Sequence, residues 1–564
     1  MLKEFIRKER IAYFSMEIAL QNDIPTYSGG LGVLAGDVLR STADLEMPMV
    51  AVTLVSRLGY FRQTIDDRGR QSESPDPWDP IQYASPLPAK VTVSIEGRDV
   101  WVSGWLYVLQ GHMGGTQPVL LLDTDLDENN EEDRRITDCL YGGDAAYRLK
   151  QEIVLGIGGA GLLNALGFNV RQYHLNEGHS ALLTLELLRR YAYPVADLRP
   201  GETPYDVPRV REMCNFTTHT PVEAGQDKFP HDLVQRVMGE MIDPQTLKLL
   251  AGGDGLNMTR LALNVSDYVN GVAKRHAEVS RKMFPGYRVR AITNGVHAYT
   301  WASPPFRKLY DEHLPGWCHE PEQLLRVDCC IDDDAVWQAH VQAKQNLIDK
   351  VHTLTGAELN TELPIIGFAR RMTAYKRTDL LFSDMARLKG IAEEHPFQVV
   401  LSGKAHPMDE AGHHLIEELH QHIRELSGII PMAYIPNYDM NIALSMVSGV
   451  DMWLNTPLKP MEASGTSGMK ASFNGVPNLS VLDGWWIEGC IEGVTGWAIG
   501  EHGKTDNDGD ACSLYEKLEK VVLPLYDGNR AGWIAVMKGA ISKNASIFNS
   551  HHMMRRYAAD AYVR

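Results

Sequence analysis

Short apolar segments alternate with longer amphipathic ones along almost the whole chain, and this alternation constrains the fold more than any other feature. Candidate strands lie at residues 10–16, 48–55, 119–123, 170–175, 212–217 and 289–293, and then at 364–369, 398–403, 429–435, 452–456 and 479–482. Helical patterns such as 335–354 and 378–388 lie between them. Strands that alternate with helices are typical of parallel sheets, so the sequence predicts an α/β chain with two doubly wound halves.

A seam between the halves is expected after Asn294, where the segment WASPPFRKLYDEHLPGW breaks both periodicities. The expected domains are therefore residues 1–294 and 295–564, the second ending in helices from about residue 514. Ligands of open α/β sheets bind beyond the carboxyl ends of the strands. Two Rossmann-like domains that face each other would thus place a site in the cleft between them.

Charge and cysteine content exclude several classes of function. The formal net charge of −17 provides no global positive field for a nucleic acid or an anionic membrane. The basic first residues are not followed by an uninterrupted apolar stretch, so no secretory signal is expected. Seven cysteines without a CxxC spacing favour reduced thiols and a cytoplasmic protein.

Two motifs have a structural interpretation. Residues 156–161 match GxGxxG by letter, but they continue an apolar helical pattern, which indicates close helix packing rather than a dinucleotide site. The histidines at 413, 414, 420 and 422 alternate with glutamates and lack an HExxH spacing. We interpret them as a solvated helix face, and no metal site is expected.

Three other segments point to chemistry. In the glycine loop, residues 27–35, Gly29 and Gly30 open a helix and could present free N–H groups to an anion, although a simple tight loop is an equal alternative. Residues 367–377 place four cations after an apolar strand, which favours phosphate binding over surface decoration. Lys404, at the end of the next strand, is expected to join these cations.

The third segment is EASGTSGMKAS, residues 462–472, in which small residues open a helix around Lys470. The apolar neighbours of Lys470 could desolvate its ammonium and lower its pKa, as a lysine that forms a Schiff base requires. The alternative is a surface lysine whose stem lies along apolar atoms.

From SMEIAL to LDGWWIEG, and above all in EASGTSGMK, the chain resembles the α-glucan phosphorylases in a short prokaryotic form. The resemblance implies two facing Rossmann-like domains of the GT-B architecture. It implies pyridoxal 5′-phosphate on Lys470, in the second domain. Further cofactor contacts are implied for Thr466, Ser467, Arg370, Tyr438 and Lys404.

The resemblance also implies the substrates, an α-1,4-glucan with inorganic phosphate or glucose 1-phosphate. Arg371 and Lys376 match substrate-phosphate ligands, and Gly29 and Gly30 match the loop over that phosphate. His219 and Asn294 match residues that grip the glucosyl 6-hydroxyl. The other sugar contacts are implied for Tyr375, Glu462, Ser464, Gly465, Glu177 and His179.

The implied reaction is reversible, retaining phosphorolysis of terminal glucosyl units, with the cofactor phosphate as proton relay. Two phosphates of charge near −2 about 5 Å apart repel by roughly 13 kcal/mol at an effective dielectric of 20. The cation cluster would offset this repulsion. Ala19 stands where relatives often have Tyr, so contacts to the cofactor ring are expected to differ there.

The family's nucleotide-controlled N-terminal extension has no counterpart before the first strand, so no response to AMP is expected. A homodimer is one possible assembly, and the oligomeric state is left open. Two alternatives also stay open: a nucleotide-sugar glucosyltransferase of the glycogen or starch synthase kind, and a glucan-binding protein without catalysis. The first would not need Lys470, and the second predicts loss of cations, yet Arg371, Lys376 and Lys470 are all present.

Overall fold

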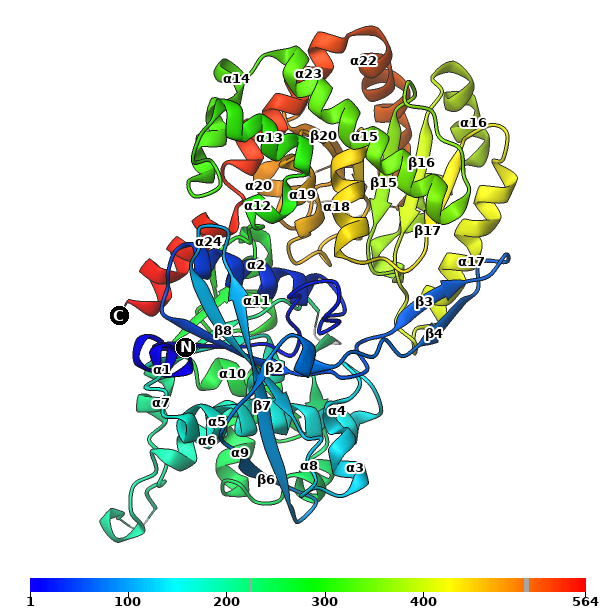
Figure 1. Ribbon diagram of the computed structural model, residues 1–564. Coiled ribbons are helices and arrows are strands. Elements are labelled where there is room, and N and C mark those ends of the chain that lie inside the picture. The colour runs from blue at the N-terminus through cyan, green and yellow to red at the C-terminus, as the bar shows by residue number, and fades with distance from the viewer. Residues whose placement is uncertain (200, 223–224, 502–506, 564) are drawn as a thin grey trace.

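The computed structural model describes residues 1–199, 201–222, 225–501 and 507–563. Figure 1 shows two lobes, each built around its own twisted sheet with helices packed on it. Within the described residues, none of the helices combines the length and the hydropathy that crossing a membrane requires.

The sheet of the first lobe has ten strands in the order β14-β13-β10-β9-β1-β2-β8-β7-β5, with β6 paired to β7. The strands from β14 to β8 in this order run parallel, and β5, β6 and β7 form an antiparallel edge. Their bounds are β1 Ile11–Phe14, β2 Met49–Leu54, β5 Ser85–Pro86, β6 Val91–Ile95, β7 Arg98–Gln110, β8 Thr116–Asp123, β9 Gln172–Asn176, β10 Cys214–Thr217, β13 Tyr268–Gly271 and β14 Arg290–Ala291.

The sheet of the second lobe has six parallel strands in the order β17-β16-β15-β18-β19-β20. They span β15 Ile365–Ala369, β16 Gln398–Ser402, β17 Met432–Ile435, β18 Met452–Asn455, β19 Asn478–Val481 and β20 Gly496–Ile499. Most of these strand residues are buried, as expected for a parallel sheet with helices on both faces. Two short antiparallel pairs complete the strands, β3 Arg62–Ile65 with β4 Gln71–Ser74 and β11 Lys228–Phe229 with β12 Leu256–Asn257.

Helices connect and cover the strands. The longer ones that precede the predicted seam are α1 Leu2–Lys8, α2 Gly30–Asp44, α4 Ala145–Ile153, α5 Gly159–Leu166, α6 Leu183–Arg190, α7 Val207–Met213, α8 His231–Val237, α9 Pro244–Ala251, α10 Met258–Asn264 and α11 Lys274–Met283. Those that follow it are α13 Pro304–His313, α15 Asp333–Thr355, α16 Met385–Glu394, α17 Glu410–Glu425, α18 Met440–Gly449, α19 Thr466–Ser472, α21 Asn507–Lys517, α23 Arg530–Gly539 and α24 Ser550–Tyr557.

Both sheets are doubly wound, as predicted, and each has a switch point where the strand order reverses. In the first sheet the switch lies between β1 and β9, and Glu17 and Glu177 follow these strands. In the second sheet it lies between β15 and β18, and Arg370 and Arg371 follow β15. Ligand crevices form at such points, so the topology places these four side chains where a site is expected.

The glycine-rich helical segment is a packing element, as predicted. It runs through α4, a π-helical stretch at Val154–Gly158 and α5. A Cβ added to Gly156 would lie 2.6 Å from the backbone nitrogen of Leu183, and one on Gly159 would lie 2.8 Å from the Phe14 ring. The absence of side chains at these positions therefore lets the helix approach its neighbours closely.

Two features of the fold differ from the sequence-based expectation. The helix expected over 378–388 is interrupted. A 3-10 segment spans Thr378–Phe382, and Asp384 then caps α16 by accepting from Arg387 N at 3.0 Å. Strands β3 to β7, β11, β12, β13 and β20 were not among the candidates. Every candidate strand is present at least in part.

The C-terminal helices do not stay with the second lobe. Met553, Met554 and Tyr557 of α24 pack in a core shared with α2 and β1, and the Tyr557 hydroxyl lies 3.1 Å from Thr217 Oγ1. Figure 1 shows this red segment crossing to the first lobe. The expected domain of residues 295–564 is corrected accordingly: its last helix joins the first lobe, because α24 supplies apolar side chains that cover that lobe's sheet.

Candidate active site

Lys470 lies in α19 with only 7% of its surface exposed. Its Nζ stands 4.0 Å from the centre of the Trp301 ring, and burial lowers its pKa to about 8 against the opposing effect of Asp37. The indole of Trp301 in turn donates to the Asp37 carboxylate at 2.8 and 3.0 Å. Lys470 is therefore a desolvated amine and not a surface lysine, which is the first of the two alternatives raised by the sequence.

Two cations share one carboxylate in the segment that precedes α19. Glu462 Oε2 accepts from Arg370 Nη2 at 2.5 Å and from Lys376 Nζ at 2.6 Å, and all three side chains are at most about 10% exposed. Burial alone would raise the pKa of Glu462, but Lys376 and Arg370 outweigh it and hold the pKa at about 2. We call Arg370, Lys376 and Glu462 the buried cluster, and with both cations charged it carries one net positive charge.

The buried cluster leaves hydrogen-bonding capacity unused. Arg370 Nε and Nη1 are buried and have no partner among the described residues. The hydroxyls of Thr373 and Ser464 and the side-chain oxygen of Asn455 are also buried with no partner in the described chain. Unpaired buried polar atoms are costly, so their concentration at one place indicates a site built for a polar ligand.

Arg371, the next residue, lies in a different environment. Its side chain is exposed, and a Cβ added to Gly29 would lie 3.2 Å from its Nη2. The glycine loop of the first lobe therefore faces a cation of the second lobe. A Cβ on Gly30 would meet nothing within 4 Å, so the loop presents open space there.

The first N–H groups of the glycine loop are already occupied. Glu17 Oε2 accepts from Ser28 N at 2.6 Å and from Gly29 N at 3.1 Å, and Tyr141 donates to Glu17 Oε1 at 3.0 Å. The loop therefore cannot offer all of its N–H groups to an anion. A carboxylate of the chain holds the turn, which leaves the face toward Arg371 for an anion.

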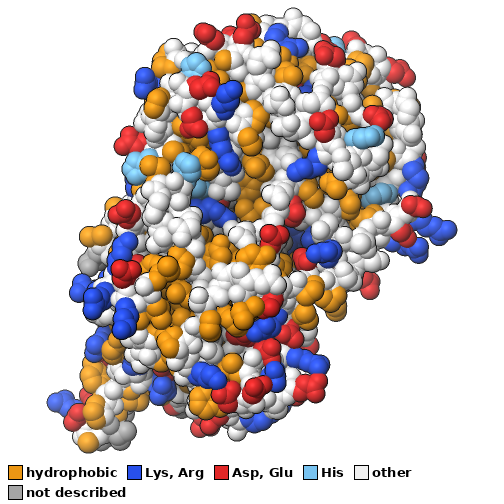
Figure 2. Space-filling model, in the orientation of Figure 1, with side chains coloured by type: hydrophobic (Ala, Val, Ile, Leu, Met, Phe, Trp, Pro, Cys, Tyr) orange, Lys and Arg blue, Asp and Glu red, His pale blue; other side chains and the backbone are white. Residues whose placement is uncertain are grey.

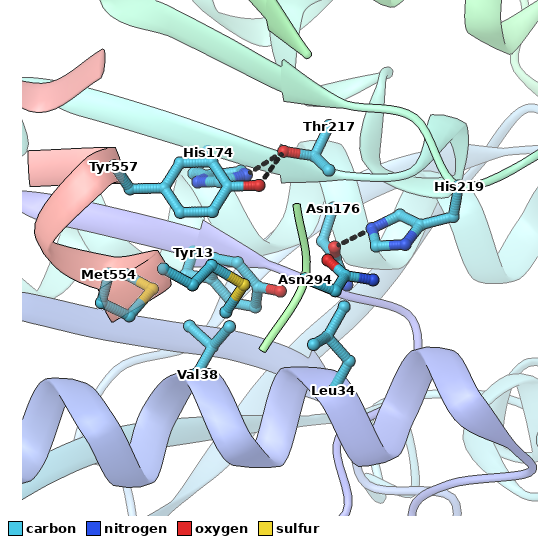
Figure 3. Close-up of a pocket in the computed structure, with 11 residues that line it drawn as sticks. Tyr13, Leu34, Val38, His174, Asn176, Thr217, His219, Asn294, Met554 and Tyr557 are labelled. Atoms are coloured by element: carbon cyan, nitrogen blue, oxygen red, sulfur yellow. Dashed lines mark hydrogen bonds between the residues drawn. The ribbon is translucent and has the colours of Figure 1, made fainter. Parts of the chain in front are cut away.

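His219 and Asn294 border a small cavity of about 10 Å³ in the first lobe (Figure 3). His219 Nε2 lies 2.7 Å from Asn176 Oδ1, and burial lowers the pKa of His219 to about 3. The Asn294 side-chain oxygen is buried and has no partner in the part of the chain that the structure describes. A neutral imidazole and a free amide oxygen are groups that suit a sugar hydroxyl.

Glu177 is not exposed to a cleft but supports the His219 loop. Its carboxylate accepts from His219 N at 2.7 Å, Thr220 Oγ1 at 2.9 Å and Gly178 N at 3.0 Å, and burial raises its pKa. Its backbone has φ +72°. The structure thus gives Glu177 a supporting role for the His219 loop, and its expected contact with a sugar stays a prediction.

His179 lies beside this support, and its Nε2 is 3.3 Å from Asp227. Burial lowers the pKa of His179 to about 4, and its Nδ1 has no partner among the described residues. The imidazole thus retains one free nitrogen for a ligand.

Lys404 and Tyr438 line a larger cavity, of about 400 Å³, together with Tyr27 and Ser28 of the glycine loop. Lys404 Nζ donates to the Phe61 carbonyl at 3.0 Å, and burial lowers its pKa to about 8. The hairpin β3–β4 fixes the segment around Lys404, since Gln63 and Gln71 bond to the backbone of residues 403 and 405. The cavity therefore lies between the lobes.

The remaining predicted residues surround the buried cluster. The ring of Tyr375 lies 4.5 Å from Lys376 Nζ. Gly465 adopts φ +86° before α19, which favours glycine at this position, and Thr466 is the first residue of the helix. Ser467 Oγ accepts from the Trp453 indole at 3.1 Å.

Sequence reasoning missed several residues of this site. Asp37 and Trp301 enclose Lys470, and Tyr141 and Asn176 hold Glu17 and His219. No local pattern marks them, because each approaches its partner only in the folded chain. Figure 2 shows basic and acidic side chains interspersed over both lobes, so the clustered cations are a feature of the cleft and not of this face.

Comparison with known proteins gives consistent results. The profile of the family described as carbohydrate phosphorylase matches residues 227–508. The chain is 38% identical to the maltodextrin phosphorylase of Thermococcus litoralis, over 99% of this chain and 71% of that protein. It is 34% identical to the glycogen phosphorylase of Aquifex aeolicus, over 99% and 86% of the two chains. An uncharacterised protein of Methanocaldococcus jannaschii is 31% identical over 98% and 99%.

Proposed function

This chain belongs to the carbohydrate phosphorylase family, and from that premise we propose that its cleft catalyses reversible, retaining phosphorolysis of terminal α-1,4-glucosyl units to glucose 1-phosphate. One observation carries the assignment of the site: Lys470, eight residues after Glu462 of the buried cluster, is a desolvated amine, and Arg370 of that cluster retains unpaired, buried N–H groups. The named relatives act on maltodextrin or glycogen, so an α-glucan is the substrate class.

The family generally depends on pyridoxal 5′-phosphate, and the residues of this chain fit that group. Lys470 has the lowered pKa that attack on an aldehyde requires. Arg370 has two buried donors available for a phosphate, and Thr466, Ser467, Tyr438 and Lys404 are the further candidate contacts. When bound, the cofactor would supply a phosphate group able to exchange a proton with the substrate phosphate.

The residues that would bind the substrate phosphate come from both lobes. Arg371 is exposed beside Gly29. Its guanidinium can therefore form bidentate contacts with an incoming anion without first breaking an ion pair within the described chain. Lys376 adds a positive charge while it stays paired to Glu462. Because Gly29 and Gly30 carry no side chains, the loop can approach the anion closely.

The glucosyl group would be oriented by neutral donors and acceptors. His219 and Asn294 are proposed to bind one hydroxyl, and Glu177 fixes the backbone of the His219 loop. Glu462, Ser464, Gly465, Tyr375 and His179 are the proposed contacts to the rest of the sugar. Hydrogen bonds to several hydroxyls give a discrimination that an apolar wall does not.

The two alternatives raised by the sequence are not favoured. A nucleotide-sugar glucosyltransferase has no need for a buried amine such as Lys470, and a binding protein without catalysis has no need for the buried cluster. The family assignment also supports the phosphorylase.

Hydride reduction of the purified protein, followed by peptide mapping, tests the proposal. A pyridoxyl adduct on Lys470, absent from Lys470→Arg, is expected together with glucose 1-phosphate formation from maltodextrin and phosphate. Nucleotide-sugar turnover by protein that carries no adduct would instead support the synthase alternative and refute the proposal.

A further inference from the structure

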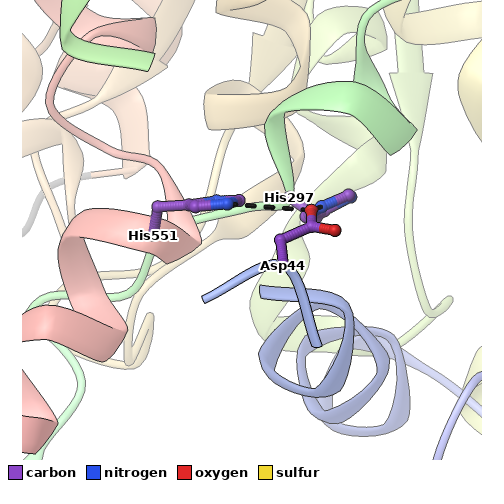
Figure 4. A group of neighbouring side chains, drawn as sticks. All are labelled: Asp44, His297 and His551. Atoms are coloured by element: carbon purple, nitrogen blue, oxygen red, sulfur yellow. Dashed lines mark hydrogen bonds and ion pairs between the residues drawn. The ribbon is translucent and has the colours of Figure 1, made fainter. Parts of the chain in front are cut away.

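Outside this cleft, three metal-ligating side chains meet at a buried point where the two lobes join. Asp44 lies at the end of α2, His297 precedes α12 Ala298–Trp301, and His551 lies in α24 (Figure 4). These three segments are more than 200 residues apart from one another in the sequence. The sequence predicted no metal site, because this cluster has no local spacing.

The cluster has the dimensions of a metal site. Asp44 Oδ2 lies 2.9 Å from His297 Nε2 and 3.7 Å from His551 Nε2, and one ligand atom from each residue falls within 4.8 Å of the others. All three side chains are at most 2% exposed. It is the one such group of ligands among the residues that the structure describes.

Hydrogen bonding inside the chain does not satisfy the cluster. Among the described residues, the buried His551 Nε2 has no hydrogen-bond partner. At 3.7 Å from the Asp44 oxygen it is too far for a good hydrogen bond, and an unprotonated nitrogen there would face a carboxylate. A cation between the three atoms would remove this conflict, because Asp44 Oδ2 and, when each ring keeps its proton on Nδ1, both Nε2 atoms can donate lone pairs to it.

Each ligand also has an outer partner that fixes its orientation. Asp44 Oδ1 accepts from Met113 N at 3.0 Å, which leaves Oδ2 directed at the imidazoles. His297 Nδ1 lies 2.7 Å from Thr300 Oγ1, and His551 Nδ1 lies 3.3 Å from Ser41 Oγ. His297 Nδ1 also lies 3.2 Å from Thr300 N. A histidine that binds a metal through Nε2 keeps its proton on Nδ1 and donates it to an outer acceptor, and here Thr300 Oγ1 and Ser41 Oγ can accept that proton.

We propose that Asp44, His297 and His551 bind one Zn²⁺ ion through Oδ2 and the two Nε2 atoms. Two imidazoles and a carboxylate suit Zn²⁺, and a water molecule would complete a tetrahedral set. The ion joins the two lobes, because α2 and α24 pack on the first sheet and His297 begins the connection to the second lobe. The site is separate from the proposed reaction and does not depend on it.

Metal analysis and Co²⁺ substitution of the full-length protein test this proposal. We expect about one zinc per chain in protein purified from zinc-supplemented cells. We also expect a higher Tm after Zn²⁺ addition to chelator-treated protein, and Co²⁺ absorption typical of tetrahedral coordination. His551→Gln and Asp44→Asn should lose the zinc, the Tm shift and the Co²⁺ band.

Two further variants make the test specific. Thr300→Val removes only an outer partner and should weaken Zn²⁺ binding about 10- to 100-fold while the protein stays folded. His552→Gln, next to His551 but about half exposed, should retain the zinc. If wild-type protein binds no zinc, or if its zinc persists in both ligand variants, the cluster is only a hydrogen-bonded Asp–His pair or the ion is bound elsewhere, and the proposal fails.

Discussion

Arg370 and Arg371 are adjacent in the sequence and follow the same strand, yet they lie in opposite environments. Arg370 is buried and ion-paired with Glu462, whereas Arg371 is exposed to the cleft beside Gly29. A charge taken out of water needs a permanent counter-ion, so Arg370 belongs to a fixed network. Arg371 keeps accessible surface in the cleft, which leaves it available for a substrate anion. One strand end thus supplies both a structural cation and a binding cation.

Among the changes that test this difference, removal of the carboxylate shared by Arg370 and Lys376 should have the largest effect. Glu462→Gln leaves two buried cations without their anion and is expected to lower the free energy of unfolding by about 3–5 kcal/mol. Urea denaturation measures this change. Glu492→Gln is the control, because Glu492 pairs with Lys517 near the surface and should cost less than about 1 kcal/mol. Equal effects of the two variants would contradict the buried cluster.

Substitution of the exposed cation should affect activity and not stability. Arg371→Ala is expected to lower kcat/KM for phosphorolysis about 10²- to 10³-fold, because it removes a donor that faces developing charge. The Tm and the cofactor content should stay close to wild type, whereas Arg370→Ala should lower both. Turnover of Arg371→Ala at ordinary phosphate concentrations would remove Arg371 from the site.

The buried cluster should also give the stability a defined pH dependence. The pKa of Glu462 is held at about 2 in the folded chain, below its ordinary value of 4.5. Its stabilising contribution is therefore complete above about pH 4.5 and is lost as the pH falls toward 2, by at most about 3 kcal/mol. Urea titrations of wild type and Glu462→Gln should converge over this range. A constant difference between the two proteins would show that Glu462 titrates normally.

The smallest expected effect concerns the contact between the glycine loop and Arg371. The Cβ of Gly29→Ala would lie 3.2 Å from Arg371 Nη2, so the flexible guanidinium must shift by a few tenths of an ångström. We expect a loss of about 3- to 10-fold in kcat/KM, mainly through the KM for phosphate. Gly253→Ala, where a Cβ meets nothing within 4 Å, is the control. An unchanged KM would separate the loop from Arg371.

Much of the fold could be predicted from the sequence. Buried parallel strands such as β1, β15 and β16 appear as continuous apolar runs, and the residues after them mark the ligand edge. Strands β13, YVNG, and β20, GWAI, were missed because a glycine in each shortens the apolar run. The interruption at Asp384 depends on one capping side chain, which an apolar pattern does not show.

The candidate site was predicted in its parts but not in its pairings. Lys470 has apolar neighbours in the sequence, so its desolvation was expected. It was not expected that Glu462 would be the counter-ion of Arg370 and Lys376. The support that Glu177 gives to His219 was not expected either. These pairs are separated by 42 to 92 residues, and their geometry is set by how the strands order in the sheet.

The amino-acid sequence by itself determined the local chemistry and the class of fold: apolar periodicity defines the strands, and EASGTSGMK defines the lysine and its family. Only the tertiary structure decided which distant groups meet. It brings Trp301 over Lys470, returns α24 to the first lobe and gathers Asp44, His297 and His551 at one buried point. The physical reason is that side-chain periodicity is a local property, whereas ion pairing and ligand clustering depend on packing between segments hundreds of residues apart.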